Sequence, residues 1–170
     1  MAHIAALLSD RGVPPSLAAS AISIGGLSLI GGRIASGYLL DRFHATYVTL
    51  GFLIIALAGV LMILWEGPLL FSWLGTACVG LGLGAEIDLI AFLICRYLGQ
   101  REFGAIYGYL FGSFTLGSAI GPLAMGTSFS IGGSYSYALA GSALGLLLAS
   151  MLVARFGPYR YRADGTPLSC

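Results

Sequence analysis

Five long apolar runs, separated by short polar connections, dominate the hydropathy pattern of this chain. They cover roughly residues 16–40, 47–65, 69–97, 103–129 and 135–156. An α-helix rises about 1.5 Å per residue, so about twenty apolar residues cross the ~30 Å hydrocarbon core of a bilayer. Continuous runs of this length favour helices over the alternating ten-residue strands of membrane barrels. We therefore predict an all-α, polytopic transmembrane bundle with five full spans.

A shorter apolar run occupies residues 1–8, before the polar segment that ends at Pro14 and Pro15. Eight helical residues rise only about 12 Å, which is too short to cross the bilayer. We expect this run to be the last turns of a sixth helix whose beginning is absent. The helical unit then covers residues 1–156, and residues 157–170 are expected to form a polar, disordered tail.

Proline and glycine mark several boundaries of the predicted spans. Pro15 followed by Ser16 is typical of a helix start, and Gly67 with Pro68 closes the second span. Pro122 predicts a kink inside the fourth span. Residues 130–134 are expected to form a loop before the fifth span.

The composition supports an integral membrane protein. The chain is 58% hydrophobic and only 9% charged, whereas about 25% of the residues in a soluble domain are charged. Its net charge of +1 gives no reason to expect a nucleic-acid partner. The three cysteines form no CxxC or Cys/His pattern, so neither a disulfide framework, a metal site nor a cofactor is expected. No HExxH, GxSxG or P-loop motif is present, which argues against the common enzyme classes.

The arginines alternate between the connections, which predicts the orientation of the bundle. Arg42 follows the first span, Arg96 and Arg101 follow the third, and three further arginines follow the fifth. The connection after the second span carries only Glu66. Because cytoplasmic connections carry an excess of basic residues, we expect the arginine-bearing end and the C-terminus to be cytoplasmic, in the plasma (inner) membrane.

Two carboxyl groups, Glu86 and Asp88, lie inside the third span. A charge at this depth costs roughly 2.5–3.5 kcal/mol on insertion scales. Measured from Tyr97, they lie about 16 and 14 Å deep, and two residues on a helix are about 200° apart. One acid can therefore face a cavity, while the other needs a partner on a neighbouring helix or a proton. A carboxyl group that exchanges a proton near neutral pH would serve proton-coupled transport; the alternative is a protonated or hydrogen-bonded structural acid.

The connection between the first two spans carries a recognisable motif. It consists of Gly32, Arg33, Gly37, Asp41 and Arg42. This Gly-Arg-x-x-x-Gly-Tyr-Leu-x-Asp-Arg pattern resembles the cytoplasmic loop signature of the major facilitator superfamily. It is similar to the second copy, as found in the monocarboxylate and oxalate/formate exchanger branch. Arg33 is expected either to reach toward the charged turn as an anchor or to act as a conformational latch.

A second junction carries the rest of the resemblance. Arg96, Arg101 and Glu102 precede a glycine stripe that reads as a close-packing face, with a glycine–proline element that reads as a pivot or a packing kink. The stripe and this element comprise Gly104, Gly108, Gly112, Gly117, Gly121 and Pro122. This stretch resembles the junction between the tenth and eleventh helices of the same branch.

The resemblance implies that the chain is the C-terminal six-helix half of a twelve-helix secondary transporter, with its first helix truncated. It also implies transport of a small organic solute, for which a carboxylate is the candidate, with protons and the missing N-terminal half as further partners besides membrane lipid. In that fold the tenth helix lines the cavity, which favours Glu86 over Asp88 as the cavity residue. The absence of several deep cations argues against oxalate-like specificity. The alternative is a membrane fragment or assembly protein that transports nothing.

Overall fold

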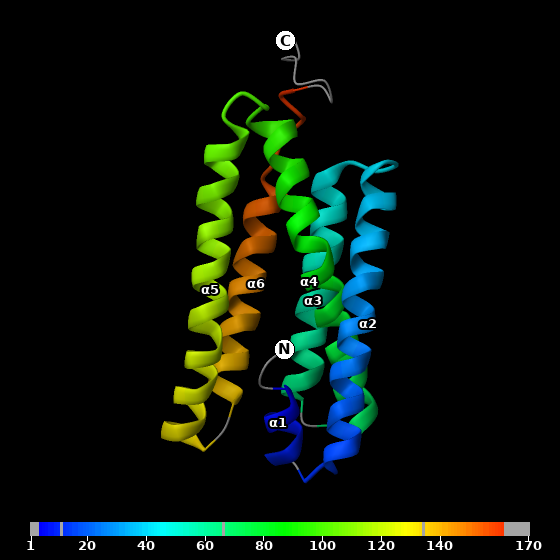
Figure 1. The fold of residues 1–170 in the computed structure, drawn as a ribbon, viewed down its shortest axis with the longest axis vertical. Coiled ribbons are helices and arrows are strands. Elements are labelled where there is room, and N and C mark those ends of the chain that lie inside the picture. Colours follow the sequence, from blue (N-terminus) through cyan, green and yellow to red (C-terminus); the bar gives the residue numbers. More distant parts are fainter. Residues whose placement is uncertain (1–3, 11, 66, 134, 162–170) are drawn as a thin grey trace.

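The computed structural model describes residues 4–10, 12–65, 67–133 and 135–161. These residues form six helices that run roughly parallel or antiparallel along one long axis (Figure 1). The helices are α1 (Ile4–Asp10), α2 (Pro15–Leu40), α3 (Ala45–Leu64), α4 (Leu69–Tyr97), α5 (Phe103–Gly132) and α6 (Ser136–Ala154). Among the described residues, α2 to α6 are long and apolar enough to cross a membrane. The predicted all-α bundle with five full spans is confirmed.

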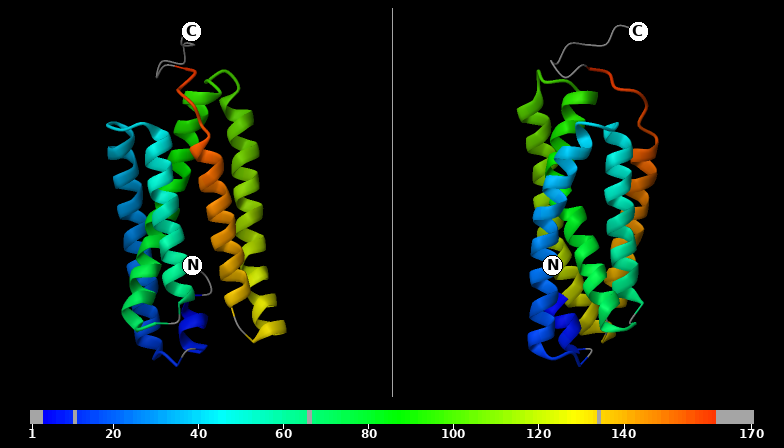
Figure 2. Two further views of the ribbon diagram at one scale, coloured as in Figure 1. Left: turned by 180° about the vertical axis from the view of Figure 1, so that it is seen from behind. Right: turned by 90° about the vertical axis from the view of Figure 1, so that its right-hand side faces the viewer.

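The connections gather at two opposite ends of the bundle. The α2–α3 connection, the α4–α5 connection and the segment after α6 lie at one end, which we call the arginine end (Figures 1 and 2). Arg42, Arg101 and Arg155 belong to these three segments. Helix α1 and the α3–α4 and α5–α6 connections lie at the opposite end. Glu66 and Arg162 fall outside the described residues.

Proline and glycine mark several of the helix boundaries. Pro14 and Pro68 are the N-cap residues of α2 and α4. Gly99, just beyond the last turn of α4, has φ 84°, and Gly133, the C-cap of α5, has φ 63°. L-residues with side chains rarely adopt these left-handed values, so glycine is suited to end both helices.

Helices α2 and α4 share the most intimate contact in the bundle. A Cβ added at Gly84 would overlap the carbonyl oxygen of Leu29, and one added at Gly32 would overlap that of Leu81. Small residues let backbones approach closely, which increases dispersion contact between membrane helices. The other side of α4 packs on α3, where a Cβ added at Gly59 would lie 2.7 Å from the carbonyl oxygen of Gly75.

Helix α5 stands apart from this glycine-mediated packing. It has no buried residue, and it meets α4 and α6 over small areas only. The predicted loop at residues 130–134 was placed too early, because α5 continues through Ser130 to Gly132 before the left-handed Gly133 ends it. The helix also continues through Pro122 for ten further residues.

The expectation of a wholly disordered tail was wrong for its first part. Residues 157–161 pack against the arginine end, and the amides of Arg160 and Tyr161 both donate to the carbonyl oxygen of Arg96 at 3.1 Å. The remaining tail residues, 162–170, lie outside the described part of the chain.

Candidate functional site

Helix α4 carries its two acids on faces that pack against different helices. Gly75 and Gly82 share the Glu86 side, and both contact α3. Gly80 and Gly84 share the Asp88 side, and both contact α2. The helical angle of about 200° between residues i and i+2 therefore separates the environments of Glu86 and Asp88 completely.

Glu86 lines an apolar pocket of about 320 Å³ between α3, α4 and α6. The walls are mostly aliphatic and include Phe52, Val60, Leu146 and Val153. The hydroxyl of Thr49, also in this lining, donates to the carbonyl oxygen of Ala45 at 2.8 Å and so serves its own helix. Among the described residues, no hydrogen-bond or ion-pair partner is found for the Glu86 carboxyl group.

Asp88 has a partner on the neighbouring helix α2. Its Oδ2 lies 3.6 Å from Nε of Arg33, and the two side chains are 38% and 52% exposed. Arg33 therefore reaches sideways to α4 instead of toward the charged turn at Asp41. The ion pair joins the two helices whose backbones are already in contact at Gly84 and Gly32.

The rest of the loop motif lies around this contact. Gly32 lies against α4, and Ser36 is fully buried. Gly37 has open space beside it. Asp41 is the C-cap of α2, and the guanidinium of Arg42 lies 4.5 Å from the centre of the Tyr38 ring.

An aromatic cluster at the arginine end joins four segments, and the hydropathy pattern and motifs of the sequence did not predict it. The hydroxyl of Tyr97 donates to the carbonyl oxygen of Gly157 at 2.7 Å and lies 2.9 Å from Oγ1 of Thr46. Tyr159 stacks on His44 at 3.9 Å between ring centres, and its hydroxyl accepts the amide hydrogen of Ala45 at 2.6 Å. The signal available in the sequence was a pair of tyrosines among arginines after the last span.

The residues of the second predicted junction lie in two different environments. The Arg96 guanidinium carbon lies 4.5 Å from the Tyr159 ring centre and 5.4 Å from that of Phe92. Arg101 and Glu102 are exposed in the α4–α5 connection. Only Arg96 is therefore integrated into the packed end of the bundle.

The predicted packing face of α5 meets no other helix within the described chain. An added Cβ would find open space within 4 Å at each of the predicted glycines, Gly104, Gly108, Gly112, Gly117 and Gly121. This contrasts with the glycines of α2, α3 and α4 that contact neighbouring backbone.

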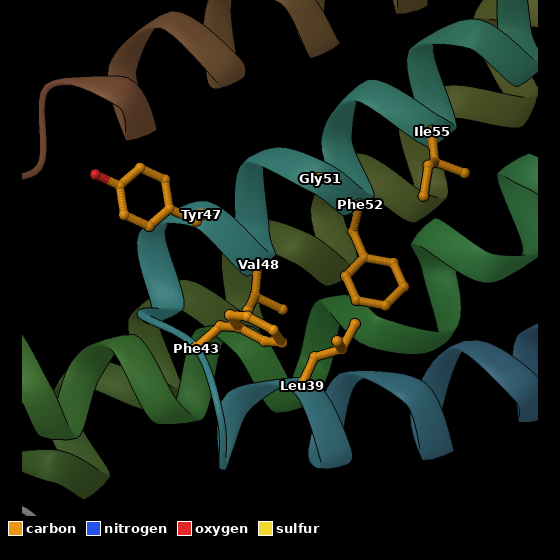
Figure 3. Close-up of a pocket in the computed structure, with 7 residues that line it drawn as sticks. All are labelled: Leu39, Phe43, Tyr47, Val48, Gly51, Phe52 and Ile55. Atoms are coloured by element: carbon orange, nitrogen blue, oxygen red, sulfur yellow. The ribbon is translucent and has the colours of Figure 1, made fainter.

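A further pocket of about 230 Å³ opens where α2 meets α3 (Figure 3). Phe43, Val48, Phe52 and Leu39 bring their side chains toward the space between the two helices. It carries no charged group, so it offers apolar surface and no acid–base chemistry. Within the described residues, no group of three or more His, Cys, Asp or Glu side chains is placed to hold a metal ion.

Comparison with known proteins identifies relatives of this arrangement. The family model described as Major Facilitator Superfamily matches residues 1–122. A benzoate transport protein of Acinetobacter baylyi is 27% identical over 111 residues, which make up 65% of this chain and 23% of that relative. The matched part thus spans about a quarter of the relative's length. No significant match to a solved structure is found.

Proposed function

Because the chain belongs to the Major Facilitator Superfamily, we propose that it forms the C-terminal half of a secondary transporter for a small organic solute. The family is one of multi-pass membrane transporters and not of enzymes. Such proteins move a solute by rocking two helical halves around a site near the bilayer midplane. The open face of α5 supports a second half as partner, since its glycines from Gly104 to Gly126 have nothing beside them within 4 Å in the described chain.

The proposed substrate is a small organic carboxylate. Two observations support this class: the loop motif resembles the monocarboxylate and oxalate/formate branch, and a relative is named for benzoate transport. Arg33, the only arginine well inside a span, is engaged by Asp88, so this chain offers no set of deep cations for a dicarboxylate.

Proton coupling is assigned to Glu86, and the contrast between the two acids carries this proposal. Asp88 lies 3.6 Å from Arg33 in an ion pair between α4 and α2, and loss of its charge would leave that arginine unpaired. Glu86 faces an apolar pocket and has no such partner among the described residues. Glu86 can therefore gain or lose a proton without breaking an ion pair.

We further propose that the arginine end faces the cytoplasm.

The test uses the complete transporter that contains this chain, reconstituted in vesicles with a benzoate gradient or a pH gradient. Glu86→Gln is expected to abolish proton-driven uptake while exchange of labelled for unlabelled solute continues. Asp88→Asn is the matched control and is expected to keep proton coupling. Coupling that survives Glu86→Gln and fails in Asp88→Asn would show that the wrong acid was chosen.

The requirement for a second half is tested separately. The 170-residue chain alone is expected to give no uptake above that of empty vesicles. Robust uptake by the chain alone would contradict the two-half proposal, and no uptake by the complete protein would favour an assembly role without transport.

A further inference from the structure

A large cavity lies at the arginine end, beside α4, α5 and the segment after α6. Its volume is about 1030 Å³. Leu93, Ile94 and Leu110 contribute apolar walls, and Arg155 and Arg160 contribute positive charge. It is more than three times as large as the Glu86 pocket, and the proposed function does not use it.

The two arginines of this cavity are not neutralised by the described residues. Both side chains are exposed, and no described carboxylate lies within ion-pair distance of either. Of the other arginines at this end, Arg96 and Arg42 lie against aromatic rings, whereas Arg101 is exposed in the α4–α5 connection, outside the cavity lining. The uncompensated charge favours an anionic occupant.

The apolar part of the cavity continues along α4 toward the middle of the bundle. Ile90 and Leu93 line both this cavity and the Glu86 pocket. Glu86 lies eleven residues from Tyr97, which corresponds to about 16 Å along the helix. Half of a ~30 Å hydrocarbon core is about 15 Å, so the two pockets together extend over the depth of one acyl chain.

We propose that this cavity and the adjoining pocket bind one anionic phospholipid. The phosphate lies against Arg155 and Arg160, and an acyl chain lies along Ile90 and Leu93. Basic pockets between transmembrane helices bind anionic headgroups in this way. A free phosphate would leave the apolar wall exposed to water, whereas a lipid covers it. The small contact area between α4 and α5 leaves room for the chain.

The test titrates dioleoylphosphatidylglycerol into the purified 170-residue chain in detergent and counts bound lipid by native mass spectrometry. Wild type is expected to retain one phosphatidylglycerol molecule and no dioleoylphosphatidylcholine. The double variant Arg155→Gln/Arg160→Gln is expected to bind about 30-fold more weakly, since each basic residue near an anionic headgroup contributes roughly fivefold. The control Arg42→Gln/Arg101→Gln removes the same charge from the same end, outside the cavity, and should change binding less than threefold.

A second pair of variants tests the apolar wall without changing charge. Leu93→Trp adds bulk where the two pockets meet and is expected to reduce binding at least tenfold. Leu148→Trp lies on exposed α6 surface outside both linings and should leave binding unchanged, with helix content by circular dichroism as the folding control.

Three results would overturn the proposal. An equal loss of phosphatidylglycerol binding in the two double-arginine variants would show that only the general positive charge of this end matters. Unchanged lipid binding in Leu93→Trp would show that no acyl chain lies where the cavity meets the Glu86 pocket. Full competition by soluble glycerol phosphate would identify a site for a free phosphate. None of these outcomes bears on the proposed role of Glu86, because the transport experiments measure uptake and not lipid binding.

Discussion

Arg33 and Asp88 place opposite charges on two neighbouring membrane helices, 3.6 Å apart. A lone charge in hydrocarbon costs roughly 2.5–3.5 kcal/mol on insertion scales. Both side chains are partly exposed in this chain, so only part of that cost applies. The ion pair therefore contributes to stability mainly because neither α2 nor α4 is left with an unpaired charge.

The ion pair predicts a non-additive pattern of stability. Arg33→Gln and Asp88→Asn are each expected to lower the free energy of unfolding by about 1–2 kcal/mol, because each leaves its partner unpaired. The double variant should cost less than the sum of the two, since no unpaired charge remains. Unfolding in sodium dodecyl sulfate, followed by circular dichroism, measures all three values. Arg42→Gln at the end of α2 is the control, and strictly additive costs would contradict a direct interaction.

The separation of the two acids follows from helical geometry alone, and the sequence predicted it. Positions 86 and 88 must face different ways on any α-helix. The identity of the partner was not predictable in the same way, because it depends on the register of α2 against α4. Gly32, Gly80 and Gly84 set that register through backbone contact, and only the structure shows which turns meet.

At the scale of whole helices, glycine has two distinct roles in this bundle. In α4 it sits against the backbone of α2 and α3, where a side chain would clash. In α5 the glycines from Gly104 to Gly126 face open space. Similar small-residue spacing in the sequence therefore corresponds to a contact in one helix and to an unoccupied face in the other.

A pair of glycine substitutions should distinguish these roles. Gly84→Ala places a Cβ against the Leu29 carbonyl and is expected to destabilise the chain by about 1–3 kcal/mol, the usual cost of overpacking. Gly108→Ala meets nothing within 4 Å and is expected to be neutral or stabilising by up to about 1 kcal/mol, because alanine favours helix. Thermal unfolding of both variants in detergent tests this; equal destabilisation would mean that α5 is also closely packed in solution.

The sequence predicted helix number and most boundaries because apolar length, proline and glycine act locally. The end of α5 was predicted too early because Ser130 and Gly132 resemble loop residues, yet a membrane helix retains them while its backbone hydrogen bonds remain internal. The packed segment at residues 157–161 was missed for a different reason. Its order comes from contacts with His44, Ala45 and Arg96, which are more than fifty residues away in the chain.

Across the whole molecule, the short helix α1 ties the beginning of the chain to its last span. Leu7 and Leu8 are buried in a cluster that includes Ala21 of α2 and Leu139 of α6. The hydroxyl of Tyr135, at the start of α6, interacts with the Asp10 carboxylate at the end of α1. Desolvation, followed by the charge and hydrogen bond of Asp10, raises the pKa of Tyr135 above its ordinary value near 10.

A raised tyrosine pKa means that the fold favours the neutral phenol. Its contribution to stability is therefore complete below the unfolded-state pKa and is lost as the pH rises through the higher pKa of the folded state. Wild type should lose more stability between pH 9 and 11.5 than Tyr135→Phe, as measured by thermal unfolding at each pH. Tyr137→Phe, which alters an exposed neighbour, is the control. Identical pH profiles for wild type and Tyr135→Phe would contradict the Asp10 contact.

The contact of Tyr159 with Ala45 also has a consequence for biosynthesis. Ala45 begins α3 and leaves the ribosome more than a hundred residues before Tyr159. The amide at the start of α3 and the ring of His44 must therefore remain without this partner until α6 has been inserted. Closure of the arginine end is thus among the last steps of assembly, and a ribosome that stalls before Pro158 would leave a bundle with this end still open.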